Sequence, residues 1–228
     1  MDSDVRAALI WFNAHTRKNG IITVDLAALQ DNALLLLPLM AGAYLLGSIS
    51  SAILICRVLG YPDPRLDGSG NPGATNVLRV GGKPGAALTL AADVLKGVVP
   101  VLLARGLALS PTGVALTGFF AVLGHILPVF FQFRGGKGVA TAFGMLFALH
   151  WPAGLVAGAV WVALFGLLRV SSVASMAAFV AAPVALWFWL PAAFAPMVVL
   201  TLVLLARHHE NIRRLLNGEE LGFGKAGE

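Results

Sequence analysis

Long apolar stretches alternate along the chain with short polar loops that are rich in glycine. A membrane-spanning helix needs about 20 mostly apolar residues, because the hydrocarbon core is about 30 Å thick and a helix rises 1.5 Å per residue. The alternation expected of a membrane barrel is absent. The pattern therefore predicts an all-α polytopic membrane protein, a bundle of seven transmembrane helices with glycine-rich cytoplasmic loops. The predicted spans are 34–59, 85–105, 111–132, 136–150, 152–168, 171–189 and 191–207.

Two of these predictions leave alternatives open. The fourth span, 136–150, is short and begins with glycines, so it is either a crossing or a partly buried, re-entrant helix. The sixth and seventh spans are separated only by Leu190 and Pro191, so a six-span arrangement is the alternative.

Composition supports the membrane class. The chain of 228 residues is 58% hydrophobic and 12% charged, and its mean hydropathy is +0.83. A soluble domain of this length needs far more polar surface. We expect a membrane domain over 34–220, an N-terminal extension over 1–33 and a cytoplasmic tail over 221–228. The extension lacks the features of a signal peptide, so it is either a short periplasmic surface helix or the product of a misassigned start codon.

The charges predict the orientation of the bundle. Lys and Arg outnumber Asp and Glu by 16 to 11, and basic residues mark cytoplasmic loops. Seven spans place eleven basic residues on one face and four on the other, with Lys96 inside a span. The C-terminus is therefore expected inside and the N-terminus outside. Nucleic acid is excluded as a partner, because these charges lie in short loops between apolar spans. The lone Cys56 excludes an intramolecular disulfide, and we expect neither a metal nor a cofactor.

The first loop combines glycines with polar side chains. Gly68, Gly70 and Gly73 allow positive φ and close approach of a ligand, and free N–H groups in such a loop form an anion-binding concavity. Side-chain donors accompany them, and Arg79 offers a planar fork for phosphate. The alternative is an ordinary turn-rich connector. The side-chain donors are Ser69, Asn71, Thr75 and Asn76.

A second cluster precedes the fourth span. Gly135, Gly136 and Gly138 are expected to expose backbone donors at a helix start, where the helix dipole favours an anion, and Lys137 adds a positive charge. The spacing of an ATP-binding P-loop fails here, since position 131 is Phe and position 138 is Gly. The alternative is a simple basic anchor on the cytoplasmic side.

Other polar residues stand close to or within spans. Asp93 and Lys96 share a face of the second span, where an ion pair and a substrate contact are both plausible. His208 and Asn211 share a face if the last helix continues beyond residue 207, in a segment that also contains Glu220. Ser175, near the start of the sixth span, is either a packing residue or a ligand contact.

Taken together, these segments resemble the bacterial acyl-phosphate:glycerol-3-phosphate acyltransferase family, PlsY. The resemblance covers about residues 47–220, and its motifs follow one another in the order of the family. The matching segments are GSISSA at 47–52, GSGNPGATNVLR at 68–79, DVLKG at 93–97, GHILPVFFQFRGGKGVAT at 124–141, SVASM at 172–176 and RHHENIRRLLNGEE at 207–220.

The resemblance implies a seven-helix enzyme of the bacterial inner membrane. Such an enzyme transfers a fatty acyl group from acyl phosphate to the 1-hydroxyl of sn-glycerol 3-phosphate and releases phosphate, an early step of phospholipid synthesis. It implies both substrates, membrane lipid and the enzyme that makes acyl phosphate as partners. It also implies Lys137, Arg79, Ser69 and His208 as catalytic residues. The implied substrate contacts are Gly68, Gly70, Asn71, Gly73, Thr75, Asn76, Lys96, Gly135, Gly136, Gly138, Ser175, Asn211 and Glu220.

Two other classes of protein compete with this interpretation. A transporter of organic phosphate would suit broken helices and basic sites within the membrane, but the two halves show no evident repeat and the polar clusters gather on one face. A non-catalytic lipid-binding scaffold would not need so many converging phosphate donors.

Overall fold

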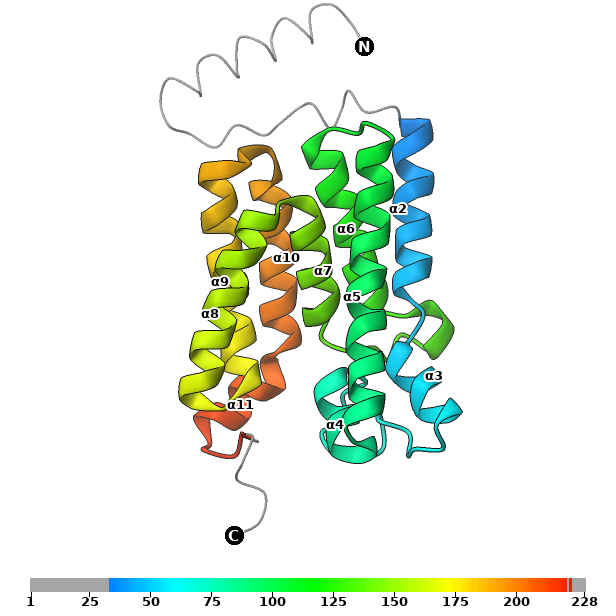
Figure 1. Cartoon of the computed structure of the whole chain (residues 1–228), viewed down its shortest axis with the longest axis vertical. Coiled ribbons are helices and arrows are strands. Elements are labelled where there is room, and N and C mark those ends of the chain that lie inside the picture. Colours follow the sequence, from blue (N-terminus) through cyan, green and yellow to red (C-terminus); the bar gives the residue numbers. More distant parts are fainter. Residues whose placement is uncertain (1–32, 221, 223–228) are drawn as a thin grey trace, which may run out of the picture.

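The computed structural model describes residues 33–220 and 222, and among them every regular element is a helix. The predictions for the N-terminal extension and for nearly all of the tail lie outside these residues. Apolar helices run side by side along the long axis of the molecule (Figure 1). The prediction of an all-helical polytopic membrane protein is therefore confirmed in its coarse form.

Five segments of the described chain are long and apolar enough to cross a membrane. A sixth candidate is a pair of helices, Pro191–Arg207 and His209–Leu216, bent by 54° at His208. The five segments are Ala33–Val58 (α2 with α3), Lys83–Gly106 (α5), Pro111–Phe131 (α6 with η2), Trp151–Leu168 (α8) and Ser171–Trp189 (α9).

The predicted fourth span is shorter than expected. Its helix, α7 (Val139–Leu149), has 11 residues, which at 1.5 Å per residue is about 16 Å, roughly half of the hydrocarbon thickness. The residues from Gly136 to Gly138 belong to the preceding loop instead. The count of seven full-length spans is therefore not confirmed by helix length.

The predicted first span is interrupted. Helix α2 (Ala33–Gly47) ends before Ser48, and α3 (Ser51–Val58) begins after Ser50. The Ser48 hydroxyl donates to the carbonyl of Tyr44 at 2.8 Å, a local bond that competes with helix continuation. The ammonium of Lys96 donates to the Ile49 carbonyl at 3.0 Å, so this backbone acceptor is satisfied without a helical partner.

The structure has the predicted boundary between the sixth and seventh spans. Helix α9 ends at Trp189, a short 3₁₀ turn covers Pro191–Ala193, and α10 covers Phe194–Arg207. Pro191 lacks the N–H that would continue α9 and begins the 3₁₀ turn instead, although Pro183 is accommodated inside α9.

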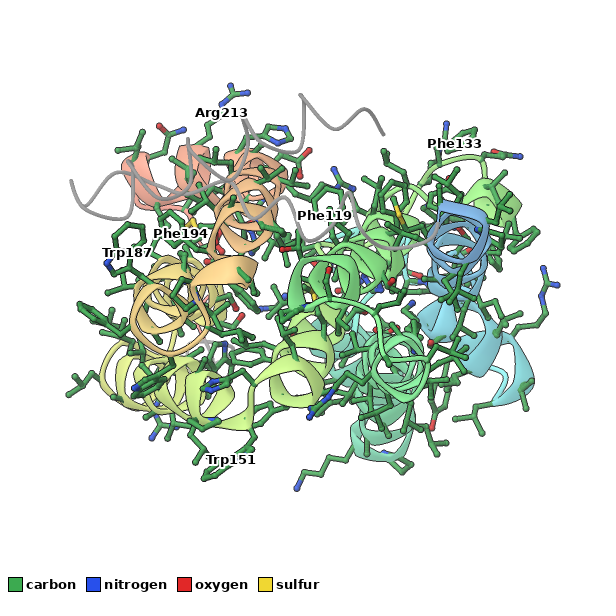
Figure 2. The ribbon with its side chains drawn as sticks, turned by 90° about the horizontal axis from the view of Figure 1, so that it is seen from above. Phe119, Phe133, Trp151, Trp187, Phe194 and Arg213 are labelled. Carbon is green, nitrogen blue, oxygen red and sulfur yellow. The ribbon has the colours of Figure 1, made fainter. Side chains whose placement is uncertain are left out.

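Glycines let the central helices approach closely. A β-carbon at Gly97 would overlap the carbonyl of Thr141, and one at Gly144 would overlap the carbonyl of Val94, so α5 and α7 lie backbone against backbone. Small residues serve this purpose in membrane bundles. The outer surface is apolar, and Figure 2 shows Trp151 and Trp187 at the periphery of the bundle, as expected of aromatic residues that anchor a protein at a membrane interface.

The polar loops gather at one end of the bundle, the lower end in Figure 1, together with two short helices, α4 (Ala74–Gly81) and α11 (His209–Leu216). The Lys and Arg residues that the structure describes lie in the short helices, the loops or the helix ends at this end of the bundle, except Lys96 and Arg105. The asymmetry of charge expected from the sequence is thus present in the described part of the chain.

Candidate active site

A cavity of about 400 Å³ opens among the helices at the basic end. Its lining combines polar and apolar residues. Its polar and charged lining residues are Ser69, Asn71, Thr75, Asn76, Arg79, Asp93, His125, Lys137, Ser171, Ser172, Ser175, His208, Asn211, Arg214 and Glu220.

Three helices begin at this cavity. Gly73 precedes α4, Gly138 precedes α7 and Ser171 is the first residue of α9, and all three line the cavity. The first N–H groups of a helix have no partner within it, and the helix dipole adds partial positive charge there. Three such ends around one cavity form a strong anion site even before side chains are considered.

The first glycine-rich loop is held by Asn76. Its amide oxygen accepts the Ser69 N–H at 2.8 Å, and its amide nitrogen donates to the carbonyls of Pro64 and Asp67 at 2.8 and 2.9 Å. Asn76 is buried, so its polar atoms shape the loop. The predicted direct substrate contact of Asn76 therefore competes with three bonds inside the protein.

The glycines of this loop differ in whether they line the cavity. Gly73 lines the cavity, whereas Gly68 and Gly70 do not. Both of the latter have positive φ, at 63° and 69°, a conformation that favours glycine. A β-carbon at Gly68 would also overlap the amide of Asn76. Gly68 and Gly70 thus determine the course of the loop.

The second glycine cluster, Gly135, Gly136 and Gly138, was expected to expose backbone N–H donors, and the structure shows this only in part. The Gly136 N–H donates to the His125 carbonyl at 3.2 Å, so it does not face a ligand. Gly135 and Gly136 do not line the cavity. Their carbonyls accept from the Arg207 guanidinium at 2.9 and 3.2 Å. Only Gly138, with φ 81°, stands at the cavity as expected.

Lys137 brings a positive charge to the cavity from the loop before α7. Burial lowers the pKa of its ammonium to about 8, while Glu220 opposes that shift and Arg214 adds to it. A partly desolvated ammonium interacts more strongly with an anion than an exposed one does. The protonated ammonium of Lys137 is therefore suited to hold a phosphate.

Glu220 joins the tail to the start of α9. Its carboxylate accepts from the Ser172 hydroxyl at 2.6 Å, the Asn211 amide at 2.5 Å and the Arg214 guanidinium at 2.8 Å. Burial alone would raise the pKa of this carboxyl, but these hydrogen bonds and the charge of Arg214 lower it overall. The carboxylate thus links α9 and α11 at the cavity.

His208 and Asn211 meet at the cavity as their spacing predicts. The Nδ1 atom of His208 lies 2.7 Å from the carbonyl of Leu204; since a carbonyl only accepts, Nδ1 carries a proton and Nε2 is the ring's acceptor in the neutral form. The side-chain oxygen of Asn211 is buried with no hydrogen-bond partner. That orphan acceptor is available to a hydroxyl group of a ligand.

A buried charge cluster lies beside the cavity. The Asp93 carboxylate is 2.9 Å from the Lys96 ammonium and 3.5 Å from His125 Nδ1. Asp93 and His125 line the cavity and Lys96 does not. Lys96 also donates to the Ile49 carbonyl, so the structure supports the ion-pair alternative for it. A substrate contact by Lys96 remains a prediction.

Ser175 is a bridge between helices as well as a lining residue. Its hydroxyl donates to the Ser171 carbonyl at 2.7 Å and accepts from the Trp161 indole at 3.0 Å. The bond holds the ring of Trp161, which also lines the cavity.

Several lining or supporting residues escaped prediction as site members. Arg207 and Arg214 belong to a segment that matches the family but are not predicted as site residues. Spacing alone does not reveal that Arg207 reaches the loop at Gly135 and Gly136. Among the described residues no group of three His, Cys, Asp or Glu side chains could hold a metal. The apolar wall consists of Leu90 and Val94 on α5, Val139, Ala140 and Phe143 on α7, and Gly158, Trp161 and Val162 on α8.

The arrangement can bind a phosphorylated molecule that also has an apolar part. The three helix ends, Lys137 and Arg79 favour phosphate, while the apolar wall favours a hydrocarbon chain. Leu90 and Val162 are half or more exposed on the outer surface, so this wall is continuous with the surface that faces lipid.

Comparison with known proteins places the chain in a family. The family model for glycerol-3-phosphate acyltransferase matches residues 37–218. A glycerol-3-phosphate acyltransferase of Methylococcus capsulatus is 54% identical over 186 residues, 80% of this chain and 93% of the relative. One from Pectobacterium carotovorum is 52% identical over 185 residues, 81% of this chain and 87% of the relative.

Solved structures agree with this match. The crystal structure of PlsY, an integral membrane glycerol 3-phosphate acyltransferase, in its glycerol 3-phosphate form is 41% identical, with a TM-score of 0.79 over 83% of this chain and 96% of that one. Its lysophosphatidic acid form gives a TM-score of 0.77 over 83% and 95%. The chain described here is therefore a member of the glycerol-3-phosphate acyltransferase family of integral membrane proteins.

Proposed function

We propose that this protein transfers a fatty acyl group from acyl phosphate to the 1-hydroxyl of sn-glycerol 3-phosphate, giving 1-acyl-sn-glycerol 3-phosphate and phosphate. The observation that carries the proposal is a single cavity in which three helix N-termini and Lys137 face an apolar wall. Both substrates have a phosphate, and only the donor has a hydrocarbon chain. Family membership supports the same reaction.

The substrates occupy different parts of this cavity in our proposal. Glycerol 3-phosphate lies near the tail, where Asn211 and His208 offer hydrogen bonds to its hydroxyls and Arg79 binds its phosphate. The acyl phosphate places its phosphate at Lys137 and the start of α7. Its chain follows the apolar wall toward the lipid.

Acyl transfer proceeds by direct attack of the glycerol hydroxyl on the acyl carbonyl. Both reactants are held in one cavity, which removes much of the entropic cost of their encounter. Lys137 and the N–H groups at Gly138, together with Ser69 of the first loop, stabilise the developing oxyanion and the leaving phosphate, while Arg79 holds the phosphate of the acceptor. A phosphate oxygen of the donor accepts the hydroxyl proton.

Two histidines compete for the role of base. Nε2 of His208 is an acceptor at the cavity when the ring is neutral, and His125 lines the cavity beside Asp93. Because we assign the proton to the donor phosphate, His208→Gln should keep kcat within about tenfold of the unaltered protein. A loss of about 10²–10⁴ in kcat would instead make His208 the general base.

The ionisation of Lys137 should appear in the pH dependence. The pKa of its ammonium is about 8, so it is charged below that pH and neutral above it. We expect kcat/KM for acyl phosphate to fall as pH rises through about 8, because Lys137 holds the donor phosphate in our proposal and this constant reports ionisation in the free enzyme. Lys137→Arg should be slower but should lack this fall, since a guanidinium stays charged. A fall near pH 8 that persists in Lys137→Arg would assign it to another group.

The topology completes the proposal. The chain crosses the membrane seven times, and α7 is a half-length crossing. This number of crossings places the basic end and the C-terminus in the cytoplasm and the N-terminus outside. The membrane domain covers 34–220, flanked by an extension over 1–33 and a tail over 221–228. The protein lies in the bacterial inner membrane, and the enzyme that makes acyl phosphate is its expected partner upstream.

Transport of an organic phosphate is the rival function, and vesicles can separate the two. Protein in sealed vesicles receives palmitoyl phosphate and radiolabelled glycerol 3-phosphate. An acyltransferase incorporates label into lipid only when palmitoyl phosphate is present. Accumulation of unmodified label inside the vesicles, independent of palmitoyl phosphate, would support transport and contradict the proposal.

A further inference from the structure

Helix α8 contains glycines that differ in what surrounds them. At Gly154 a β-carbon would come within 2.7 Å of the Phe147 ring, so close packing requires glycine there. At Gly158, one turn further along, the nearest atom is again on Phe147 but at 3.8 Å, an ordinary contact. Its φ is not positive, since it lies within the helix. Neither packing nor backbone conformation requires glycine at 158, although glycine weakens a helix relative to alanine.

Gly158 lines the apolar part of the cavity. The C-terminal end of α8 lies at the basic end of the bundle, so Gly158 is about one turn farther from the anion donors than Trp161 and Val162 (Figure 1). Opposite α8 the wall is closed, because Gly144 of α7 lies directly against the backbone of Val94 on α5. The missing side chain at 158 therefore preserves space in the part of the cavity remote from the phosphate donors.

We propose that Gly158 determines how long an acyl chain the cavity accepts. The inference rests on the acyl transfer proposed above and assigns a specificity-determining position within it. The first carbons of the chain pass Trp161, and the later ones pass Gly158. A side chain at 158 would occupy space that a long chain needs, whereas a short chain ends before it. A larger side chain at position 158 should therefore lower the preference of the enzyme for long acyl chains over short ones.

The test is a competition between two donors. Unaltered protein, Gly158→Ala and Gly158→Leu each receive glycerol 3-phosphate with equal palmitoyl phosphate and octanoyl phosphate, and mass spectrometry quantifies both lysophosphatidic acids. The initial product ratio reports the ratio of the two kcat/KM values. We expect the long-to-short ratio to fall about tenfold in Gly158→Leu, since a clash with one or more methylenes is worth at least that much, and less in Gly158→Ala.

Gly166 supplies the matched control. It lies on the same helix, its β-carbon would meet nothing within 4 Å, and it does not line the cavity, so Gly166→Leu should leave the ratio unchanged. An unchanged ratio in both Gly158 variants, or an equal loss of both products, would overturn the inference. If the unaltered protein makes neither product, the proposed function fails instead. If Gly158→Leu does not fold, Gly158→Ala still tests the inference, because its methyl group meets only ordinary contacts.

Discussion

Replacing Lys137 with alanine should lower kcat by about 10²–10³, because a preorganised positive group at the developing charge typically contributes that much. Lys137 lines the cavity at the start of α7, and burial lowers its pKa to about 8. Water that enters in place of the ammonium would solvate the leaving phosphate less effectively, since water must reorganise during the reaction. The measurement is steady-state phosphate release with both substrates saturating.

Arg134 provides the control for Lys137. It belongs to the same loop, is exposed and does not line the cavity. Arg134→Ala should therefore change kcat by less than about threefold, as expected for a screened surface charge. Similar losses in the two variants would show that the loop acts only through its general positive potential and would contradict a specific role for Lys137.

Replacing Glu220 with alanine should abolish most activity and lower stability together. The carboxylate accepts hydrogen bonds from Ser172, Asn211 and Arg214, all of which line the cavity. Its removal leaves these donors without their partner. We expect a loss of about 2–3 kcal/mol, below the cost of breaking a fully buried pair because Arg214 is partly exposed. Thermal unfolding in detergent and turnover with glycerol 3-phosphate measure the two effects.

Glu219 is the neighbouring carboxylate and makes a matched control, since it is exposed and does not line the cavity. Glu219→Ala should behave like the unaltered protein. The pKa of Glu220 is lowered in the folded state, so its stabilising effect is complete above its unfolded pKa and is lost as pH falls through the folded one. The difference in unfolding temperature between Glu220→Ala and the unaltered protein should therefore shrink in acid. A constant difference would show that the charge of Glu220 is not responsible.

The helical fold follows from sequence because bilayer thickness sets the length of an apolar run. Leu190 and Pro191 correctly predicted a boundary, since proline disfavours a continuous helix, although Pro183 lies inside α9. The break at Ser48 was not predictable in the same way. It is accompanied by a bond from Lys96, 47 residues away, to the Ile49 carbonyl, and no local pattern reveals such a contact.

The site was predictable in its residue types and less so in their roles. The family resemblance implies Lys137, His208 and Asn211 as site residues, and all three line the cavity. Gly136 looked like an exposed donor, but its N–H is taken by His125. Asn76 lines the cavity, but the hydrogen bonds of its amide hold the loop, and the sequence pattern did not indicate that role. Such roles depend on tertiary partners, which spacing alone does not specify.

The central claim is that acyl phosphate and glycerol 3-phosphate react within one cavity. Its most direct test incubates purified protein with palmitoyl phosphate and glycerol 3-phosphate and quantifies phosphate and palmitoyl glycerol 3-phosphate in the same sample. Our account predicts that the two products form in equal amounts, only when both substrates are present, and far more slowly with Lys137→Ala. Phosphate release without the acylated product, or an equal rate with Lys137→Ala, would contradict it.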